Sequence, residues 1–269
     1  MPDQDKKAGK EANMGITAEI CCGGYEDART AAAYGAQRVE LNSGLYLGGL
    51  TPGIGTLKLT KETTDLNVVS MVRPRGGGFC YSEEEFCAML RDAEELLQAG
   101  TDGIAFGFLN NDRTINIART REMTSLIHAY GKTAVFHRAF DCTGANDESI
   151  EELIGLCVDR VLTSGGRKTA MDGRLQLRHL VATYGKNIEI LAGSGINDLN
   201  VRGLIQETGV LQVHSSCHGW RMDQTAQGSD VSYGYADGRY SRMFEVVSSE
   251  KLKRFLSAVR DAEMAINDA

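Results

Sequence analysis

Two glutamates, two histidines and an arginine are placed by the strand pattern of this sequence so that their side chains share one face. They are Glu19, Glu40, Arg73, His137 and His214, and each lies in or directly after a short run typical of a β-strand. Side chains alternate across a strand, so the apolar neighbours of these residues direct the polar side chains to the opposite face. Carboxylates and histidines held together can transfer protons, and an arginine can hold an anion. The sequence therefore predicts a polar pocket.

We expect Glu40, Arg73 and His137 to form one hydrogen-bonded network, with Glu40 and His137 as acid and base and with Asp141 and His214 as further catalytic candidates. A polar core whose groups only satisfy one another is the alternative, and for any single residue it is as common as a catalytic role. Buried charges must pair, hold water or contact a ligand. Because so many ionisable groups converge, the pattern favours a ligand pocket.

Two glycine-rich segments could supply donors for an anion. The first, RPRGGG from Arg73, carries Arg73 and Arg75, and each guanidinium can bind a carboxylate or phosphate through two N–H groups. The second, GSG from Gly193, leads into a helix that Asn197 could cap, and helix N-termini of this kind bind phosphate in many barrels. Turns that merely require glycine are the alternative for both segments. The candidate substrate-binding residues are Arg73, Arg75, Ser164, Gly193, Ser194, Gly195 and Ser215.

The elements that position these residues are short β-rich runs that alternate with amphipathic helical stretches. The runs are AEICC from Ala18, RVELN from Arg38, VVSMVRP from Val68, GIAFGFL from Gly103, TAVFHRAFD from Thr133, RVLTSG from Arg160, IEILAGSG from Ile188 and LQVHSS from Leu211. This alternation is typical of βα units around a parallel sheet. It predicts an α/β protein with a single (β/α)8 TIM-barrel domain over residues 16–269, preceded by a flexible polar leader over residues 1–15. The long irregular stretch from about Trp220 to Arg239 is expected to be a lid or binding loop.

Composition narrows the classes of partner. A chain of 269 residues has the usual size of such a barrel, and its formal net charge of -7 argues against a nucleic-acid or anionic-membrane surface. No apolar run approaches the roughly 18 residues of a membrane span, and the start lacks a signal-peptide core. The odd number of cysteines, 7, fits a reducing compartment. We expect a cytoplasmic homo-oligomer that binds neither nucleic acid nor membrane.

Several segments resemble the copper homeostasis family called CutC. They are EICC from Glu19, GAQRVEL from Gly35, GGLTPGIG from Gly48, RPRGGGFCYS from Arg73, FHRAFD from Phe136, RVLTSG from Arg160, AGSGI from Ala192 and VHSS from Val213. The resemblance runs in order from about Ala18 to Ile266 and is loose only after Trp220. It implies a cytoplasmic (β/α)8 protein linked to copper handling, in which Cu(I) is proposed to bind cysteines at the ends of the first two strands.

Cys21 occupies the first of these two cysteine positions, but Asn42 occupies the second, where the family often reads RVELC or RIELC. Cu(I) prefers thiolate or thioether ligands, and an amide oxygen is a poor substitute. The first and eighth strands of a closed barrel are neighbours, so Cys217 could supply the second thiolate. We therefore take Cys21 and Cys217 as the metal ligands, expect weak Cu(I) binding, and attribute any tighter binding to these two cysteines together.

Three functions stay open at this point. The first is a copper-binding or copper-trafficking protein, whose ligand is a Cu(I) ion. The second is an enzyme in which Glu40 and His137 act on a small anionic or hydroxylated substrate. The third is a scaffold that acts through oligomer contacts, because a fold does not fix a function.

Overall fold

Eight parallel strands close into a barrel in the order in which they occur in the sequence. The computed structural model describes residues 15–268. The strands are β1 (Thr17–Cys22), β2 (Arg38–Leu41), β3 (Asn67–Met71), β4 (Gly103–Phe106), β5 (Thr133–Phe136), β6 (Arg160–Thr163), β7 (Glu189–Ala192) and β8 (Gln212–Ser215). Each lies within or overlaps a segment predicted to be a strand, so the expected (β/α)8 fold is confirmed. The expected leader over 1–15 lies, except for Gly15, outside the described residues.

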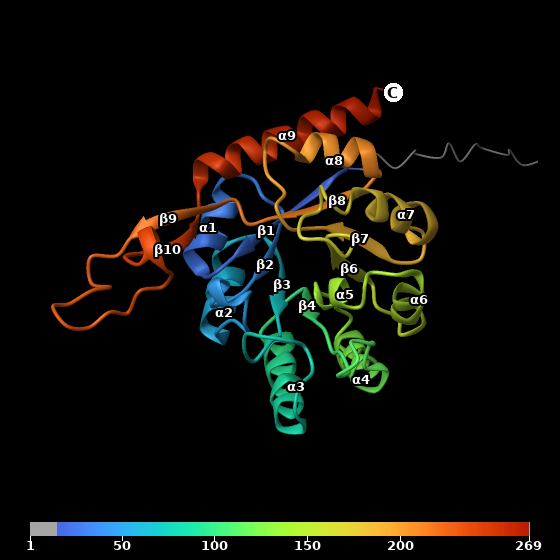
Figure 1. Ribbon diagram of the computed structural model, residues 1–269, viewed down its shortest axis with the longest axis horizontal. Coiled ribbons are helices and arrows are strands. Elements are labelled where there is room, and N and C mark those ends of the chain that lie inside the picture. The colour runs from blue at the N-terminus through green and yellow to red at the C-terminus, as the bar shows by residue number, and fades with distance from the viewer. Residues whose placement is uncertain (1–14, 269) are drawn as a thin grey trace, which may run out of the picture.

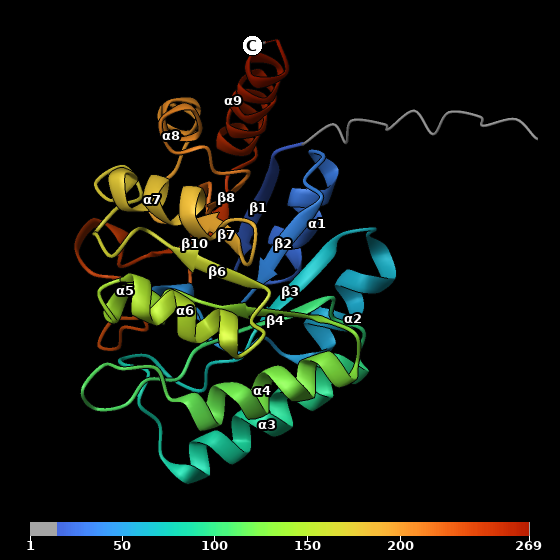
Figure 2. The ribbon, with the colours of Figure 1, turned by 90° about the vertical axis from the view of Figure 1, so that its right-hand side faces the viewer.

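Helices pack around the outside of the barrel (Figure 1). They are α1 (Tyr25–Ala33), α2 (Ile54–Thr63), α3 (Glu83–Gln98), α4 (Ile117–Ala129), α5 (Ala139–Cys142), α6 (Asp147–Gly155), α7 (Arg174–Tyr184), α8 (Val201–Thr208) and α9 (Ser249–Asn267). The expected capping box starts α3, because the Ser82 hydroxyl accepts from Glu85 N and the Glu85 carboxylate accepts from Ser82 N. Helices α3 and α4 pack together on one side of the barrel, and α8 and α9 on another (Figure 2). Within residues 15–268 no helix has the length and apolar character needed to cross a membrane.

The interior of the barrel is divided into an apolar half and a charged half. Side chains from β3, β4 and β5 form a small hydrophobic cluster of their own, which consists of Val69, Met71, Ala105 and Val135. On the other side, Glu19 of β1, Arg38 of β2 and Arg160 of β6 are almost fully buried. Buried charges are tolerated only when they are paired. Arg160 is accordingly joined to Glu189 of β7 at 2.6 Å.

The fifth predicted strand is shorter than its apolar pattern indicates. β5 ends at Phe136, and the hydrogen bond from His137 N to Phe106 O, at 2.8 Å, is the last backbone bond between β5 and β4. The chain then turns into α5, so Asp141 lies on a helix and not at the end of a strand. A short apolar run fits a strand or a helical turn equally well, which is why the pattern could not place this boundary.

The long segment after β8 contains a β-hairpin, although its sequence pattern predicted an irregular loop. β9 (His218–Met222) pairs antiparallel with β10 (Met243–Val247), and the connecting chain projects away from the barrel in Figure 1. The ring of Trp220 stacks on that of Tyr240 with a centroid distance of 4.1 Å. The stretch predicted as a lid over about 220–239 is therefore in part an ordered arm anchored by aromatic packing.

The close approach of β4 to β5 at Gly107 gives a stability prediction. A Cβ atom at Gly107 would lie 2.5 Å from His137 Cε1 and 2.8 Å from Ala139 Cβ, whereas nothing lies within 4 Å of a Cβ at Gly203 in α8. Gly107→Ala should lower the free energy of unfolding by about 1–3 kcal/mol through overpacking. Gly203→Ala should raise it by up to about 1 kcal/mol. Urea unfolding of both variants checks this, and an unchanged stability of Gly107→Ala would contradict the packing described.

Candidate functional site

The charged half of the barrel is organised around a contact between Glu19 and His214. Glu19 Oε1 lies 2.8 Å from His214 Nδ1, and Glu19 Oε2 lies 2.7 Å from Arg38 Nε in an ion pair that is not aligned as a hydrogen bond. Arg38 also donates to Gln212 Oε1 at 2.6 Å. The register of the sheet dictates these contacts, because Glu19 is aligned with His214 on one side and with Arg38 on the other.

The two partners shift each other's pKa. Burial alone would raise the pKa of Glu19, but its hydrogen bond to His214 and the charge of Arg38 bring this pKa down to about 2. Burial would lower the pKa of His214, but the bond to Glu19 and the charges of Glu40 and Glu19 leave it above its usual value. The imidazole is therefore held through Nδ1 by a carboxylate, and Nε2 is left to face other groups.

A second group gathers beside the first at the C-terminal end of the barrel. Cys21, Glu40 and His214 each offer one potential metal-ligand atom, and these atoms all lie within 4.8 Å of one another. The Cys21 thiol lies 3.7 Å from Glu40 Oε2. Asn42 donates to Glu40 Oε2 at 2.9 Å and lies 3.5 Å from Cys21 Sγ. A thiol, a carboxyl group and an imidazole nitrogen thus converge on one point.

Burial favours the protonated forms of Cys21 and Glu40. It raises the pKa of Cys21 well above its usual value, and the charge of Glu40 adds to this. It also raises the pKa of Glu40, with the charge of His214 acting in the opposite direction. A cation bound here must displace protons from both groups, so its affinity should increase with pH.

Cys217 does not join this group. Its side chain belongs to the hydrophobic layer outside the barrel together with Cys22, and its thiol lies 3.5 Å from Ser215 Oγ. Both Cys21 and Cys217 border one cavity, but Cys21 faces the barrel interior and Cys217 packs in the surrounding layer. The hydrophobic layer holds Cys217 because the residues that follow β8 turn outward toward β9. The structure thus brings Cys21 together with Glu40 and His214, and not with Cys217, which was expected to be its partner.

The expected network of Glu40, Arg73 and His137 does not form, because within residues 15–268 no direct hydrogen bond or ion pair joins any two of these side chains. Arg73 donates to the carbonyls of Leu47, Gly49 and Gly77 at 2.7–3.0 Å and so ties the loops after β2 and β3 together. Both terminal nitrogens of its guanidinium therefore already have protein partners. A strand pattern gives the side to which a side chain points, but it does not say which neighbour the side chain reaches.

His137 is a buried, neutral histidine. Its Nδ1 accepts from Ala139 N at 3.2 Å, and its ring lies 4.9 Å from that of Phe79, over which the Arg73 guanidinium also lies. Among the described residues, Nε2 of His137 has no hydrogen-bond partner. Burial, with a contribution from the charge of Arg73, lowers the pKa of His137 to about 3. A general base near neutral pH needs a higher pKa, so His214 fits that role better.

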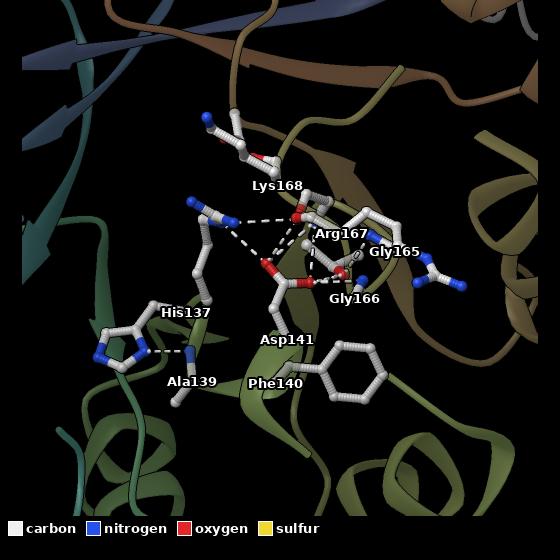
Figure 3. A network of polar contacts seen from close by, with 12 residues as sticks. His137, Ala139, Phe140, Asp141, Gly165, Gly166, Arg167 and Lys168 are labelled. Atoms are coloured by element: carbon white, nitrogen blue, oxygen red, sulfur yellow. Dashed lines mark hydrogen bonds and ion pairs between the residues drawn. The ribbon is translucent and has the colours of Figure 1, made fainter. Parts of the chain in front are cut away.

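Asp141 organises the loop that follows β6 (Figure 3). Its carboxylate accepts from Thr163 Oγ1 at 2.6 Å and from the backbone N of Ser164 and Gly166 at 3.0 Å each. It also holds Arg138 at 2.8 Å, and Arg138 donates to Ser164 Oγ at 2.9 Å. Asp141 and Ser164, which the sequence suggested as catalytic and substrate-binding, therefore position a loop and an arginine.

The two predicted anion-binding segments differ in the structure. Arg75 is exposed and paired with Glu85, so its guanidinium is occupied. In the second segment Ser194 and Gly195 border a cavity and Gly193 is not among its lining residues, and Asn197 does not cap α8. The helix begins four residues later, at Val201, because a turn precedes it. In this turn the backbone N–H of Leu199 donates to Asn197 Oδ1.

That cavity has a volume of about 560 Å³ and opens at the C-terminal end of β8. Cys21 and His214 border it on the barrel side, and Ser194, Gly195 and Ser215 border it on the loop side. Its basic side chains were missed: they are Arg138, Lys251 and Arg254. The signal that could have found Lys251 and Arg254 is the group of three basic residues, with Lys253, in the first two turns of the last helix, where the helix dipole disfavours positive charge.

The contrast between the two buried histidines gives a pH prediction for the metal-free protein. His214 should titrate above pH 6.5, whereas His137 should stay neutral down to about pH 3. Because the folded-state pKa of His214 is raised, its contribution to stability is complete below pH 6.5 and is lost as the pH rises through the folded-state value. NMR spectra of the ring Cε1–H groups, assigned with His137→Gln and His214→Gln, test this. A His137 ring that titrates near pH 6.5 would refute the assignment.

Comparisons with known proteins agree with this architecture. The profile of the CutC family matches residues 16–219. A CutC family protein from Treponema denticola is 40% identical over 245 residues, which are 91% of this chain and 99% of that protein. The copper homeostasis protein CutC homologue of Drosophila melanogaster is 41% identical over 208 residues, 76% of this chain and 78% of that protein. A crystal structure of a CutC protein from Streptococcus agalactiae superposes with a TM-score of 0.70 at 29% identity and covers 75% of this chain and 98% of its own. This chain belongs to the CutC copper homeostasis family.

Proposed function

We propose that this protein binds a copper ion in the cytoplasm through Cys21, Glu40 and His214. The observation that carries the proposal is the convergence of their three ligand atoms within 4.8 Å. Membership of a copper homeostasis family supports copper as the ion. The free state of every cysteine fits the reducing cytoplasm. The expected homo-oligomer stays a prediction.

The second coordination shell supports a metal at this point. Ligating histidines usually donate their other ring nitrogen to a carboxylate, which fixes the tautomer and orients the ring. Glu19 fills that role for His214 at 2.8 Å, and Arg38 neutralises Glu19. His214 Nε2 is then the nitrogen that can coordinate an ion. The three ligands would leave one further position open toward the cavity.

The donor atoms of the site predict how strongly Cu(I) binds and which other ion could compete. Imidazole and thiolate both suit copper, but Cu(I) gains most from several sulfur ligands. This site offers one sulfur, because Asn42 lies beside Cys21 where a second cysteine is common in the resembled family. Binding of Cu(I) should therefore be weaker than at a site with two thiolates, and the nitrogen and oxygen ligands should also accept Zn²⁺.

Metal titrations of single-residue variants test the site. Cys21→Ala and His214→Ala should each weaken copper binding at least about tenfold, measured by competition with a Cu(I) chelator under reducing conditions. Cys217→Ala, which removes a thiol that borders the same cavity, is the matched control and should leave the affinity unchanged. Tight binding that survives both Cys21→Ala and His214→Ala would place the ion elsewhere.

Asn42→Cys tests the role of the missing thiolate. Asn42 Nδ2 lies 3.5 Å from Cys21 Sγ, so a cysteine at this position would bring a second sulfur next to the first. The same competition assay should show Cu(I) binding at least about tenfold tighter than in the wild type, since thiolates are its preferred ligands. Asn42→Ser controls for the loss of the amide. An affinity for Cu(I) equal in Asn42→Cys and Asn42→Ser would contradict this account.

A second candidate is acid–base catalysis on a small molecule, with His214 in place of the His137 suggested by the sequence. The observation in its favour is that His214 borders the cavity and lies near Glu40, whereas His137 is enclosed. Burial raises the pKa of Glu40, and the pKa of His214 is raised despite burial by its bond to Glu19 and the charge of Glu40, so both groups hold a proton more readily than in water and could pass it to a substrate. Catalysis of this kind would survive Cys21→Ala, which separates it from metal binding.

A further inference from the structure

Three basic side chains border the cavity beside the proposed metal ligands, in a protein whose formal net charge is -7. Its border includes Arg138, Lys251 and Arg254 and one carboxylate, Asp198. Asp198 is paired with Arg254 at 2.7 Å. Arg138 is shared between Asp141 and Ser164 through Nε and one terminal nitrogen, which leaves its other terminal nitrogen without a partner among the described residues. The cavity therefore favours an anion.

Lys251 is the cation with the most unused capacity. Its Nζ donates to the His218 carbonyl at 2.8 Å and forms no ion pair with a described carboxylate, so further N–H groups are free. Lys251 also lies in the first turn of α9, where the exposed backbone N–H groups already carry partial positive charge. A lysine there opposes the helix dipole, so helix stability does not explain its position. An anion bound nearby would explain it, because the anion would neutralise both the lysine and the helix N-terminus.

Backbone amides add neutral donors at the same place. Ser194, Gly195, Ile196 and Ser216 border the cavity, and their backbone N–H groups donate to no acceptor within the described part of the chain. Ser194 and Gly195 adopt positive φ angles of 81° and 70°, so the loop after β7 holds a turn that few side chains tolerate. Loops after the seventh and eighth strands are where barrels of this fold hold phosphate groups.

We propose that this cavity binds the phosphate group of a small phosphorylated molecule, held by Lys251, Arg138 and the free amides of the loops after β7 and β8. Several N–H donors around one tetrahedral anion give charge-assisted hydrogen bonds, which are about twice as strong as neutral ones. The rest of the molecule would extend toward Cys21 and His214, which border the same cavity. The inference does not depend on copper, because none of these phosphate donors is a metal ligand.

Inorganic phosphate is the probe, added to metal-free protein in the presence of a chelator. Calorimetry should show saturable binding, and ¹H–¹⁵N NMR should show shifts that centre on the amides of Ser194–Ile196 and Ser216. Lys251→Glu should weaken binding at least about tenfold, which corresponds to one lost charge-assisted contact. Lys253→Glu is the matched control, because Lys253 lies on the same helix over the ring of Tyr34 and does not border the cavity.

Three results would overturn the proposal. They are shifts no larger than those caused by chloride at equal ionic strength, shifts centred on another part of the protein, and equal phosphate affinity in the wild type and Lys251→Glu. The amide shifts in the wild type test the site even if a variant folds poorly. A protein that binds phosphate but no copper would support this inference and refute the proposed copper site, so the two can fail separately.

Discussion

Glu19 is the residue on which the rest of the site depends, because it carries a charge into the middle of the barrel. Removing it would leave Arg38 buried without its partner, at a cost of about 3–5 kcal/mol. One of its carboxylate oxygens forms an ion pair with Arg38, and the other contacts Nδ1 of His214. Its pKa of about 2 keeps it ionised at neutral pH. This ion fixes the orientation of His214 and so decides which ring nitrogen faces Cys21 and Glu40.

The division of the barrel interior explains why the site lies to one side. Apolar side chains from β3 to β5 pack against one another in their half of the barrel, as the cluster around Val69 and Ala105 shows. The charged half adjoins β1 and β8, and the cavity opens beside those strands. Helix α9 begins at the same place, and its first two turns bring Lys251 and Arg254 to the cavity rim. Cys21 and His214, which we propose as metal ligands, and the basic side chains therefore border the same cavity.

Strand alternation predicted the fold and the inward direction of Glu19, Glu40 and His214, because the period of a strand is a local property of the sequence. It did not predict partners. Arg73 reaches backbone carbonyls instead of Glu40, and His137 is enclosed by aromatic rings, because both outcomes depend on the path of loops that no local pattern describes. The resemblance to CutC proteins indicated the position of Cys21, but which residues complete its surroundings depends on the register between distant strands.

In the copper site that we propose, one thiolate, one imidazole and one carboxylate surround the bound ion, in contrast to the two thiolates that Cu(I) prefers. Asn42 occupies the place where a second sulfur would lie. X-ray absorption at the copper edge of the loaded protein counts the sulfur ligands directly. The account predicts one sulfur neighbour together with nitrogen or oxygen neighbours that include the imidazole of His214. A first shell with two or more sulfur atoms, or with none, would contradict it.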